Sequence, residues 1–420
     1  MFYSHQKKII DEDKKHTGLW LGTGSAKTRI ALAMACGNTL VIAPKTQVED
    51  GNWEREFKLL LQQNFPSKIS DLRIISKETF RRDWESLPGA MTVIVDEAHT
   101  CLGATPNIRY VKKQAIPKTS QLFEALVSYT ERHKPERLYL ATATIMRSPM
   151  TVWGAAKLLG KDWDFYKFRH TFYTKLPMPG REVWIPKSDS ETKDRLASAV
   201  QKLGYVGRLE DFFDVPDQTY KTIFLEPTVS QVKRLKELRL EYPDPLVFLG
   251  KRHQVENGVL SGDEFNLPEA FENAKLDTLE ELALEFPKMV IFAKYRHQIS
   301  EIEKRLSENY RVITMTGDTP NRGEIIVRAN GASECIFICQ AQISAGWELP
   351  DFPVMVFASM SYSIVDRIQG EGRILRANAL KKNLYIDLVV KGGIDNAVYN
   401  SIMNKKDFNE RLYLEQNAFI

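Results

Sequence analysis

The sequence GTGSAKT at residues 22–28 places a glycine-containing turn between an apolar run and an alanine-rich stretch. Such a turn predicts a phosphate-binding loop, because backbone N–H groups and the positive end of the following helix can hold phosphate oxygens. We expect Lys27 to reach the β and γ phosphates of a nucleoside triphosphate, and the hydroxyl of Thr28 to ligate Mg²⁺. The other residues expected to line the phosphates are Gly22, Thr23, Gly24, Ser25 and Ala26.

This loop departs from the consensus GxxxxGK[ST] at two positions, because Leu21 and Ala26 stand where glycines are expected. Taken alone, the motif leaves open a glycine turn that only caps a helix. A second segment, TVIVDEAHT at residues 92–100, adds two carboxylates directly after an apolar strand. Asp96 is expected to hold the magnesium, and Glu97 to orient and deprotonate the water that attacks the γ-phosphate.

Both segments follow short β-branched runs separated by helical patterns, which is typical of parallel α/β units. Ligands of such sheets bind outside the carboxyl ends of the strands. The predicted strands of the first set are 17–21, 39–43, 92–95 and 137–141, and those of the second set are 288–293, 311–315, 334–339, 354–358 and 384–390. We therefore predict an α/β fold with domains at 1–158 and 276–420, joined by a linker or accessory segment at 159–275 with an amphipathic helix at 229–242.

Bulk composition is that of an ordinary globular protein, with 420 residues, 43% hydrophobic and 27% charged. The net charge of +4 is too small to indicate nucleic-acid binding, which must rest on local patches. No apolar run is long enough to span a membrane, and the charged N-terminus is unlike a secretory signal, so we expect a cytoplasmic protein. The four cysteines lack the spacing of a zinc site and are expected to be reduced core residues.

With DEAH at residues 96–99 and QGEGRILR at 369–376, the chain resembles a superfamily-two helicase or translocase over nearly its whole length. The resemblance implies two tandem RecA-like domains, ATP and Mg²⁺ as cofactors, and an adenine contact from Gln6. It also implies that Gln369 belongs to the nucleotide site and that Arg373 and Arg376 are catalytic. Arg376 is the preferred arginine finger, and three-residue spacing would place both arginines on one helical face.

The sequence LATAT at residues 140–144 resembles the third motif of that superfamily, so Thr142 and Thr144 are expected to couple the γ-phosphate region to the nucleic-acid path. The segment NWEREF at 52–57 resembles Swi/Snf-like members, which favours duplex DNA. Trp53 is expected in the core, whereas Trp347 could be core or a stacking surface. Phosphate contacts are expected from Lys45, Thr46, Lys294, Thr316, Arg322 and Ser344, and a nucleotide contact is expected from Gly346.

These expectations describe an ATP-dependent DNA helicase or translocase that acts as a monomer on single-stranded, duplex or branched DNA, through backbone phosphates. Its compact size suits a stand-alone viral or phage protein that works in the host cytoplasm. An RNA helicase with the same chemistry is one alternative. A nucleotide-gated binding module without hydrolysis is another, because the methyl group of Ala26 could crowd the phosphates.

Overall fold

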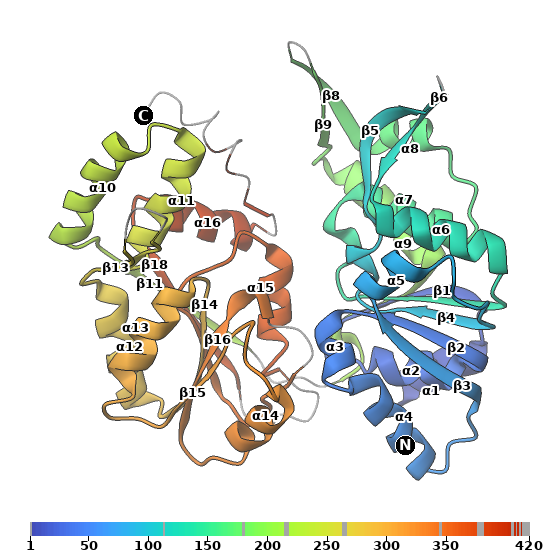
Figure 1. Ribbon diagram of the computed structural model, residues 1–420, viewed down its shortest axis with the longest axis horizontal. Helices are drawn as coiled ribbons and strands as arrows, with labels where there is room; N and C mark the ends of the chain where they lie inside the picture. The colour runs from blue at the N-terminus through green and yellow to red at the C-terminus, as the bar shows by residue number, and fades with distance from the viewer. Residues whose placement is uncertain are drawn as a thin grey trace. The chain divides into compact units, whose positions relative to one another are not determined.

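The computed structural model describes residues 2–111, 114–178, 181–213, 218–262, 267–343, 347–375, 382–404, 407–408, 410 and 413. The chain divides into two compact units, Met1–Phe213 and Asp214–Ile420 (Figure 1). Each unit is built around a six-stranded parallel sheet with helices on both faces, so the expected pair of parallel α/β domains is confirmed. Among the residues described, no helix is both long and apolar enough to cross a bilayer.

The first sheet has the strand order β10-β1-β7-β4-β2-β3, and every neighbouring pair is parallel. Its strands are β1 (His16–Leu21), β2 (Cys36–Ala43), β3 (Lys68–Ser76), β4 (Thr92–Val95), β7 (Arg137–Ala141) and β10 (Gly204–Gly207). The four strands predicted from apolar runs are all present, whereas the sheet's two edge strands, β3 and β10, were not predicted.

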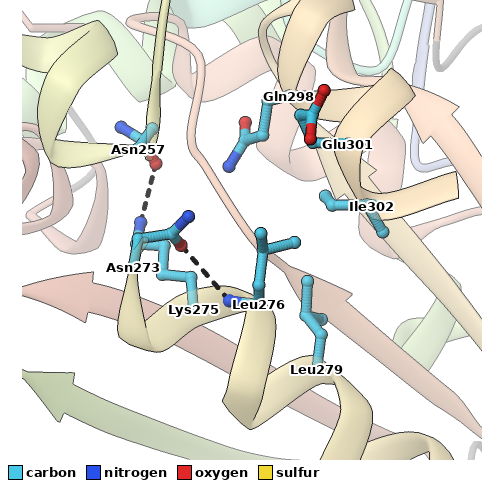
Figure 2. Close-up of a pocket in the computed structure, with 8 residues that line it drawn as sticks. All are labelled: Asn257, Asn273, Lys275, Leu276, Leu279, Gln298, Glu301 and Ile302. Carbon is cyan, nitrogen blue, oxygen red and sulfur yellow. Dashed lines mark hydrogen bonds between the residues drawn. The ribbon is translucent and has the colours of Figure 1, made fainter. Parts of the chain in front are cut away.

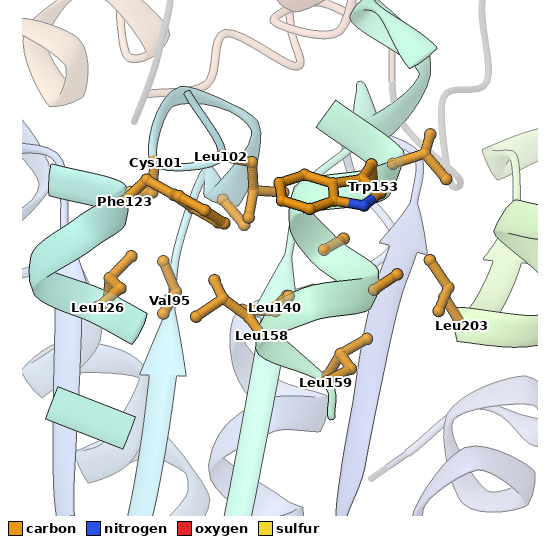
Figure 3. Packing of buried hydrophobic residues seen from close by; sticks show 14 of the residues in the cluster. Val95, Cys101, Leu102, Phe123, Leu126, Leu140, Trp153, Leu158, Leu159 and Leu203 are labelled. Carbon is orange, nitrogen blue, oxygen red and sulfur yellow. The ribbon is translucent and has the colours of Figure 1, made fainter. Parts of the chain in front are cut away.

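Successive residues of the inner strands point to opposite faces of this sheet, so each face has its own apolar core. On one face Val95 and Leu140 pack with Phe123 and Trp153, as Figure 3 shows. On the other face Ile94 packs with residues of the first helices. The helices of the unit are α1 (Ser4–Glu12), α2 (Lys27–Met34), α3 (Lys45–Glu49), α4 (Asn52–Gln62), α5 (Lys77–Asp83), α6 (Gln121–His133), α7 (Pro149–Leu158), α8 (Phe165–Phe172) and α9 (Ser190–Leu203).

Two antiparallel ribbons extend from the first unit and lie together beside α8 (Figure 1). One ribbon pairs β5 (Ala104–Val111) with β6 (Gln114–Thr119), and the other pairs β8 (Tyr173–Met178) with β9 (Arg181–Pro186). The first ribbon starts five residues after His99, so it continues directly from the carboxylate segment.

The second sheet has the order β11-β18-β17-β14-β16-β15 and is also parallel. Its strands are β11 (Thr219–Leu225), β14 (Lys288–Ala293), β15 (Val312–Met315), β16 (Cys335–Gln340), β17 (Val354–Phe357) and β18 (Leu384–Val390). Its helices are α10 (Val229–Glu241), α11 (Pro245–Glu256), α12 (Ala274–Glu285), α13 (Arg296–Leu306), α14 (Arg322–Asn330), α15 (Ile364–Glu371) and α16 (Ile394–Met403). A short ribbon pairs β12 (Val259–Leu260) with β13 (Glu269–Ala270).

The segment expected as a separate linker, residues 159–275, contributes to both units. Its β10 extends the first sheet beside β1, and its β11 extends the second sheet beside β18. Both strands escaped prediction for a physical reason, because an edge strand buries less of its surface and needs no continuous apolar run. β10 has the sequence GYVG, and the side chains of β11 are mostly polar or partly exposed. The amphipathic helix expected at 229–242 is α10.

A buried polar cluster fastens α11, α12 and α16 of the second unit to one another. Lys275 is 1% exposed, and its ammonium donates to Asn257 Oδ1 at 2.7 Å, to the Ala358 carbonyl at 2.7 Å and to Asp395 Oδ2 at 2.8 Å. Figure 2 shows Lys275 and Asn257 at the side of a small pocket. Burial lowers the pKa of the neighbouring His253 to about 4, so this ring is neutral at pH 7.

Candidate functional site

The phosphate-loop sequence forms the predicted strand–turn–helix, with β1 ending at Leu21 and α2 starting at Lys27. Gly24 has φ +78°, which is a conformation that favours glycine. Ala26 caps α2 in the left-handed region, at φ 58° and ψ 43°. This is one of the consensus positions where the sequence lacks glycine, so Ala26 adopts the conformation that glycine would hold more easily.

The side chain of Lys27 turns back over the loop. Its ammonium donates to the carbonyls of Leu21 at 2.9 Å and Gly22 at 3.0 Å, while Ser25 Oγ donates to the Gly22 carbonyl at 2.6 Å. The loop therefore gathers a cation, a hydroxyl at Thr28 and the first N–H groups of an eight-residue helix at one place. This donor set fits a triphosphate with Mg²⁺.

The carboxylate segment follows the fully buried β4, as predicted. Asp96 is 6% exposed, and Asp96 Oδ1 accepts from the backbone N–H of Glu97 at 2.9 Å. Asp96 Oδ2 lies 3.4 Å from the indole nitrogen of Trp53, which donates to it. Trp53 is thus buried, as expected, and also orients the candidate metal ligand.

The surroundings of the two adjacent carboxylates shift their pKa values in opposite directions. Burial, and next the charge of Glu97, raise the pKa of Asp96. Burial alone would raise the pKa of Glu97 as well, but its hydrogen bond with His99 and the charge of Lys27 outweigh that effect and hold this pKa low. Glu97 is therefore ionised at pH 7, as a general base must be.

Glu97 belongs to a hydrogen-bonded chain that reaches the third motif. His99 Nδ1 lies 3.4 Å from Glu97 Oε2 and 2.8 Å from Thr142 Oγ1, and Thr142 donates to Glu97 Oε2 at 3.5 Å. The backbone N–H of Thr144 in turn donates to Thr142 Oγ1 at 3.1 Å. The structure thus brings together the residues predicted for the base and those predicted for coupling.

Lys77 is a member of this site that sequence reasoning missed. It starts α5, is 7% exposed, and donates to the Glu97 carbonyl at 2.9 Å and to Thr100 Oγ1 at 2.6 Å. Glu97 itself has φ 42°, so Lys77 bonds the backbone where it takes a strained left-handed turn. Its position directly after β3, at the same edge of the sheet as Glu97, could have indicated that it belongs to the site. β3 itself was not predicted from the sequence.

Gln6 lies against the phosphate loop and is 2% exposed. Its Oε1 accepts from the Tyr3 N–H at 3.0 Å, and its Nε2 lies 3.5 Å from the Ser25 carbonyl. Lys45 and Thr46 form the start of α3 after β2, and Lys45 makes an exposed ion pair with Glu49.

The candidate phosphate contacts of the second unit follow β14 and β15. Lys294 holds its ammonium 3.1 Å from the centroid of the Tyr362 ring, and burial lowers the pKa of Lys294 to about 8. The backbone N–H of Thr316 donates to Thr319 Oγ1 at 2.8 Å, and Arg322 donates to the Gly317 carbonyl at 2.7 Å. Ser344 and Gly346, together with Ala345, lie outside the described residues.

The arginine motif differs from its expected helical form. Helix α15 ends at Glu371 with Gly372 as its C-cap, so Arg373, which was expected on a helical face, lies beyond the helix. Arg373 is buried and donates to the carbonyls of Gln369 at 2.8 Å and Trp347 at 2.7 Å. Trp347 is itself buried against Phe292.

Arg376, the preferred arginine finger, lies outside the described residues. A third arginine of this segment, Arg367, was not singled out from the sequence. It lies 5% exposed against Glu371 at 2.6 Å and Asp387 on β18, with its guanidinium over the Phe357 ring. The described arginines here therefore fix the fold of α15 on its sheet.

Three of the four cysteines are buried, and Cys36 is partly exposed. Within the described part of the chain, no cluster of three or more His, Cys, Asp or Glu side chains could hold a metal by itself. A magnesium ion at Asp96 would thus take its remaining oxygen ligands from Thr28, phosphates and water, which is the usual arrangement for Mg²⁺.

No curated protein matches the chain. Among solved structures, the Sulfolobus solfataricus SWI2/SNF2 ATPase core in complex with dsDNA is similar at 15% identity and a TM-score of 0.38, covering 96% of this chain and 91% of that one. Residues 274–378 match the family of the helicase conserved C-terminal domain. The resemblance to superfamily-two helicases that the sequence predicted is therefore confirmed in the second unit.

Proposed function

We propose that this protein hydrolyses ATP and uses the reaction to move along DNA. The observation that carries the proposal is the position of Glu97, whose side chain is 13% exposed and belongs to the hydrogen-bonded chain through His99 and Thr142 to Thr144. Lys27 is close enough for its charge to lower the pKa of both Asp96 and Glu97. A cation and two differently tuned carboxylates at one sheet edge suit phosphoryl transfer to water.

Each residue then has a distinct role. Lys27 leaves the loop carbonyls and binds phosphate oxygens, whereas the hydroxyl of Thr28 and the carboxylate of Asp96 hold Mg²⁺. When bound, Mg²⁺ neutralises charge that develops on the phosphates. Glu97 Oε2 accepts the proton of the attacking water. Trp53 orients the carboxylate of Asp96, and Lys77 holds the backbone of Glu97.

The hydrogen-bonded chain from Glu97 through His99 and Thr142 to Thr144 gives the reaction a route to the rest of the first unit. A movement of the Glu97 side chain changes its bonds to His99 and Thr142, and Thr142 in turn is bonded to Thr144. We assign Lys45 and Thr46 in the first unit, and Lys294, Thr316, Arg322 and Ser344 in the second, to backbone phosphates. Arg376 is assigned to the γ-phosphate. Such contacts are independent of base sequence and weaken as salt increases.

The test is ATP hydrolysis by the full chain, measured as phosphate release without nucleic acid and with single-stranded DNA, duplex, a fork, a four-way junction and RNA. We expect DNA to raise turnover, and duplex or branched DNA to do so most. Stimulation by RNA alone would replace this proposal by an RNA helicase. No stimulation by any of the nucleic acids would reject it.

A nucleotide-gated binding module is the second candidate, and the left-handed conformation of Ala26 favours it. A methyl group there strains the loop and lies where backbone approaches phosphate. We therefore compare wild type with Ala26→Gly, measuring both ATP affinity and turnover. ATP binding without hydrolysis in wild type, with turnover gained in the glycine variant, would favour the binding module. Turnover in both supports the motor.

A further inference from the structure

The two β-ribbons and α8 of the first unit carry a local excess of cations over carboxylates. Residues 104–119 and 165–187 together hold nine of the chain's 58 lysines and arginines, but only one of its 54 acidic residues, Glu182. The net charge of the whole chain is only +4, so these two segments are far more basic than the rest of the molecule. A local excess of this kind marks the electrostatic footprint of a polyanion.

The two ribbons form one built surface because α8 fastens both of them. Arg169 of α8 donates from Nη1 to the Pro106 carbonyl on β5 at 3.1 Å, and its guanidinium lies 4.0 Å from the Trp184 ring centroid on β9. Tyr166 of α8 donates from its hydroxyl to the Ala115 carbonyl on β6 at 3.3 Å. Arg169 is thus buried between α8 and the two ribbons.

Each of these elements carries an exposed lysine: Lys118 on β6, Lys167 on α8 and Lys175 on β8. Arg109 is partly neutralised by Glu124, at 2.5 Å, so it is the weaker member. We call these three lysines the ribbon surface.

We propose that the ribbon surface binds the backbone of duplex DNA, as a contact separate from the loops at the carboxyl ends of the strands. A two-stranded ribbon has the width that a major groove admits. Duplex DNA carries one charge per about 1.7 Å of helix axis, counted over both of its strands. Cations spread over two ribbons suit this arrangement better than they suit a single strand. This inference rests on the proposed movement on DNA and names an additional place where the track is held.

The position of the ribbon in the chain gives the contact a consequence. β5 starts five residues after His99, and the base of the ribbon is closed by the Ser120 N–H, which donates to the Gly103 carbonyl at 2.7 Å. DNA held on the ribbon surface therefore bears on the segment that carries Glu97 and His99. Loss of the contact should weaken stimulation by DNA while leaving hydrolysis without DNA unchanged.

The test variant is the triple reversal Lys118→Glu, Lys167→Glu and Lys175→Glu in the full chain. Its control is Lys233→Glu, Lys236→Glu and Arg239→Glu, which makes the same charge change at exposed positions of α10. Affinity for a duplex of about 20 base pairs, two helical turns, is measured without nucleotide over a range of salt. A single strand of the same length is the second arm, and thermal unfolding checks that each variant is folded.

We expect the triple reversal to weaken duplex binding at least about tenfold and to reduce the slope of log affinity against log salt by roughly three, one for each phosphate contact. Binding of the single strand should fall less, and the control should bind as wild type. Unchanged duplex affinity, an equal loss in the control, or a loss confined to the single strand would overturn the inference. Duplex binding that depends on the three lysines in a protein without ATPase activity would instead reject the proposed function alone.

Discussion

The two units both bury charged side chains near their sheets, but the two carboxylates that follow β4 are satisfied differently from the buried ion pairs of the second unit. In the second unit, Lys275 meets Asp395 and two further oxygens, and Arg367 meets Asp387 and Glu371. In the first unit, Asp96 and Glu97 are adjacent like charges, and the two nearby cations, Lys27 and Lys77, donate hydrogen bonds to backbone carbonyls.

This difference distinguishes charged side chains that stabilise the fold from charged side chains that are placed for a reaction. A buried pair that is completed by other side chains costs several kcal/mol to break, because one charge is left uncompensated. Two adjacent carboxylates whose pKa values are pushed apart are instead typical of a site that needs a further charged partner, such as a metal or a substrate. We therefore expect substitutions in the first group to change turnover, and substitutions in the second group to change stability.

The largest expected effect on turnover comes from Glu97→Gln, which keeps the size of the side chain and removes the base. ATP affinity should stay near that of wild type, while DNA-stimulated turnover falls by about 10²- to 10⁴-fold, the usual contribution of a general base. Phosphate release and nucleotide binding are measured side by side. The matched control is Glu78→Gln, an exposed position of α5, which should behave as wild type. Undiminished turnover in Glu97→Gln would contradict the assigned role.

The complementary prediction concerns the second unit. Lys275→Met should lower the free energy of unfolding by about 3–5 kcal/mol, because it leaves Asp395 buried without its cation. Urea unfolding, followed by fluorescence, measures the loss. Lys304→Met, at an exposed position of α13, is the control and should change stability by less than about 0.5 kcal/mol. Full stability in Lys275→Met would show that the cluster is not structural and would break the comparison.

Apolar runs predicted the inner strands of both sheets because those strands are buried on both faces. The phosphate loop and the carboxylate segment were predictable for a related reason, since short motifs directly follow such strands. The edge strand β15 was also predicted, whereas the edge strands β10 and β11 gave no comparable signal and were assigned to a linker. Lys77 was missed as a consequence, because its position at the sheet edge depends on the unpredicted β3.

Long-range pairing explains the other differences. The resemblance to the helicase motif placed Arg373 on a helix, yet glycine at the C-cap ends α15 and the guanidinium folds back onto two carbonyls. No local pattern in the sequence indicates that Lys275 meets Asp395, which lies 120 residues away. Charge counts over the whole chain likewise concealed the ribbon surface, because acidic residues elsewhere balance it.

The smallest expected effect sharpens the comparison, because Lys77 is a buried cation like Lys275 but bonds the catalytic turn. Lys77→Met removes the donor to the Glu97 carbonyl and to Thr100. Losing a hydrogen bond from a charged group costs about 1.5–3 kcal/mol, so kcat should fall roughly 10- to 100-fold if the whole loss reaches the transition state.

A positioning role and a purely structural role give different results for Lys77. If Lys77 positions Glu97, ATP affinity and thermal stability change little, kcat falls, and Lys77→Arg recovers part of the lost turnover because a guanidinium can still donate to the carbonyl. If Lys77 only stabilises the fold, the unfolding temperature falls while kcat of the folded fraction stays near wild type. Arg81→Met, at an exposed position of the same helix, controls for the loss of one charge. A purely structural outcome would place Lys77 in the same group as Lys275. Glu97 would then keep its left-handed conformation without the hydrogen bond from Lys77.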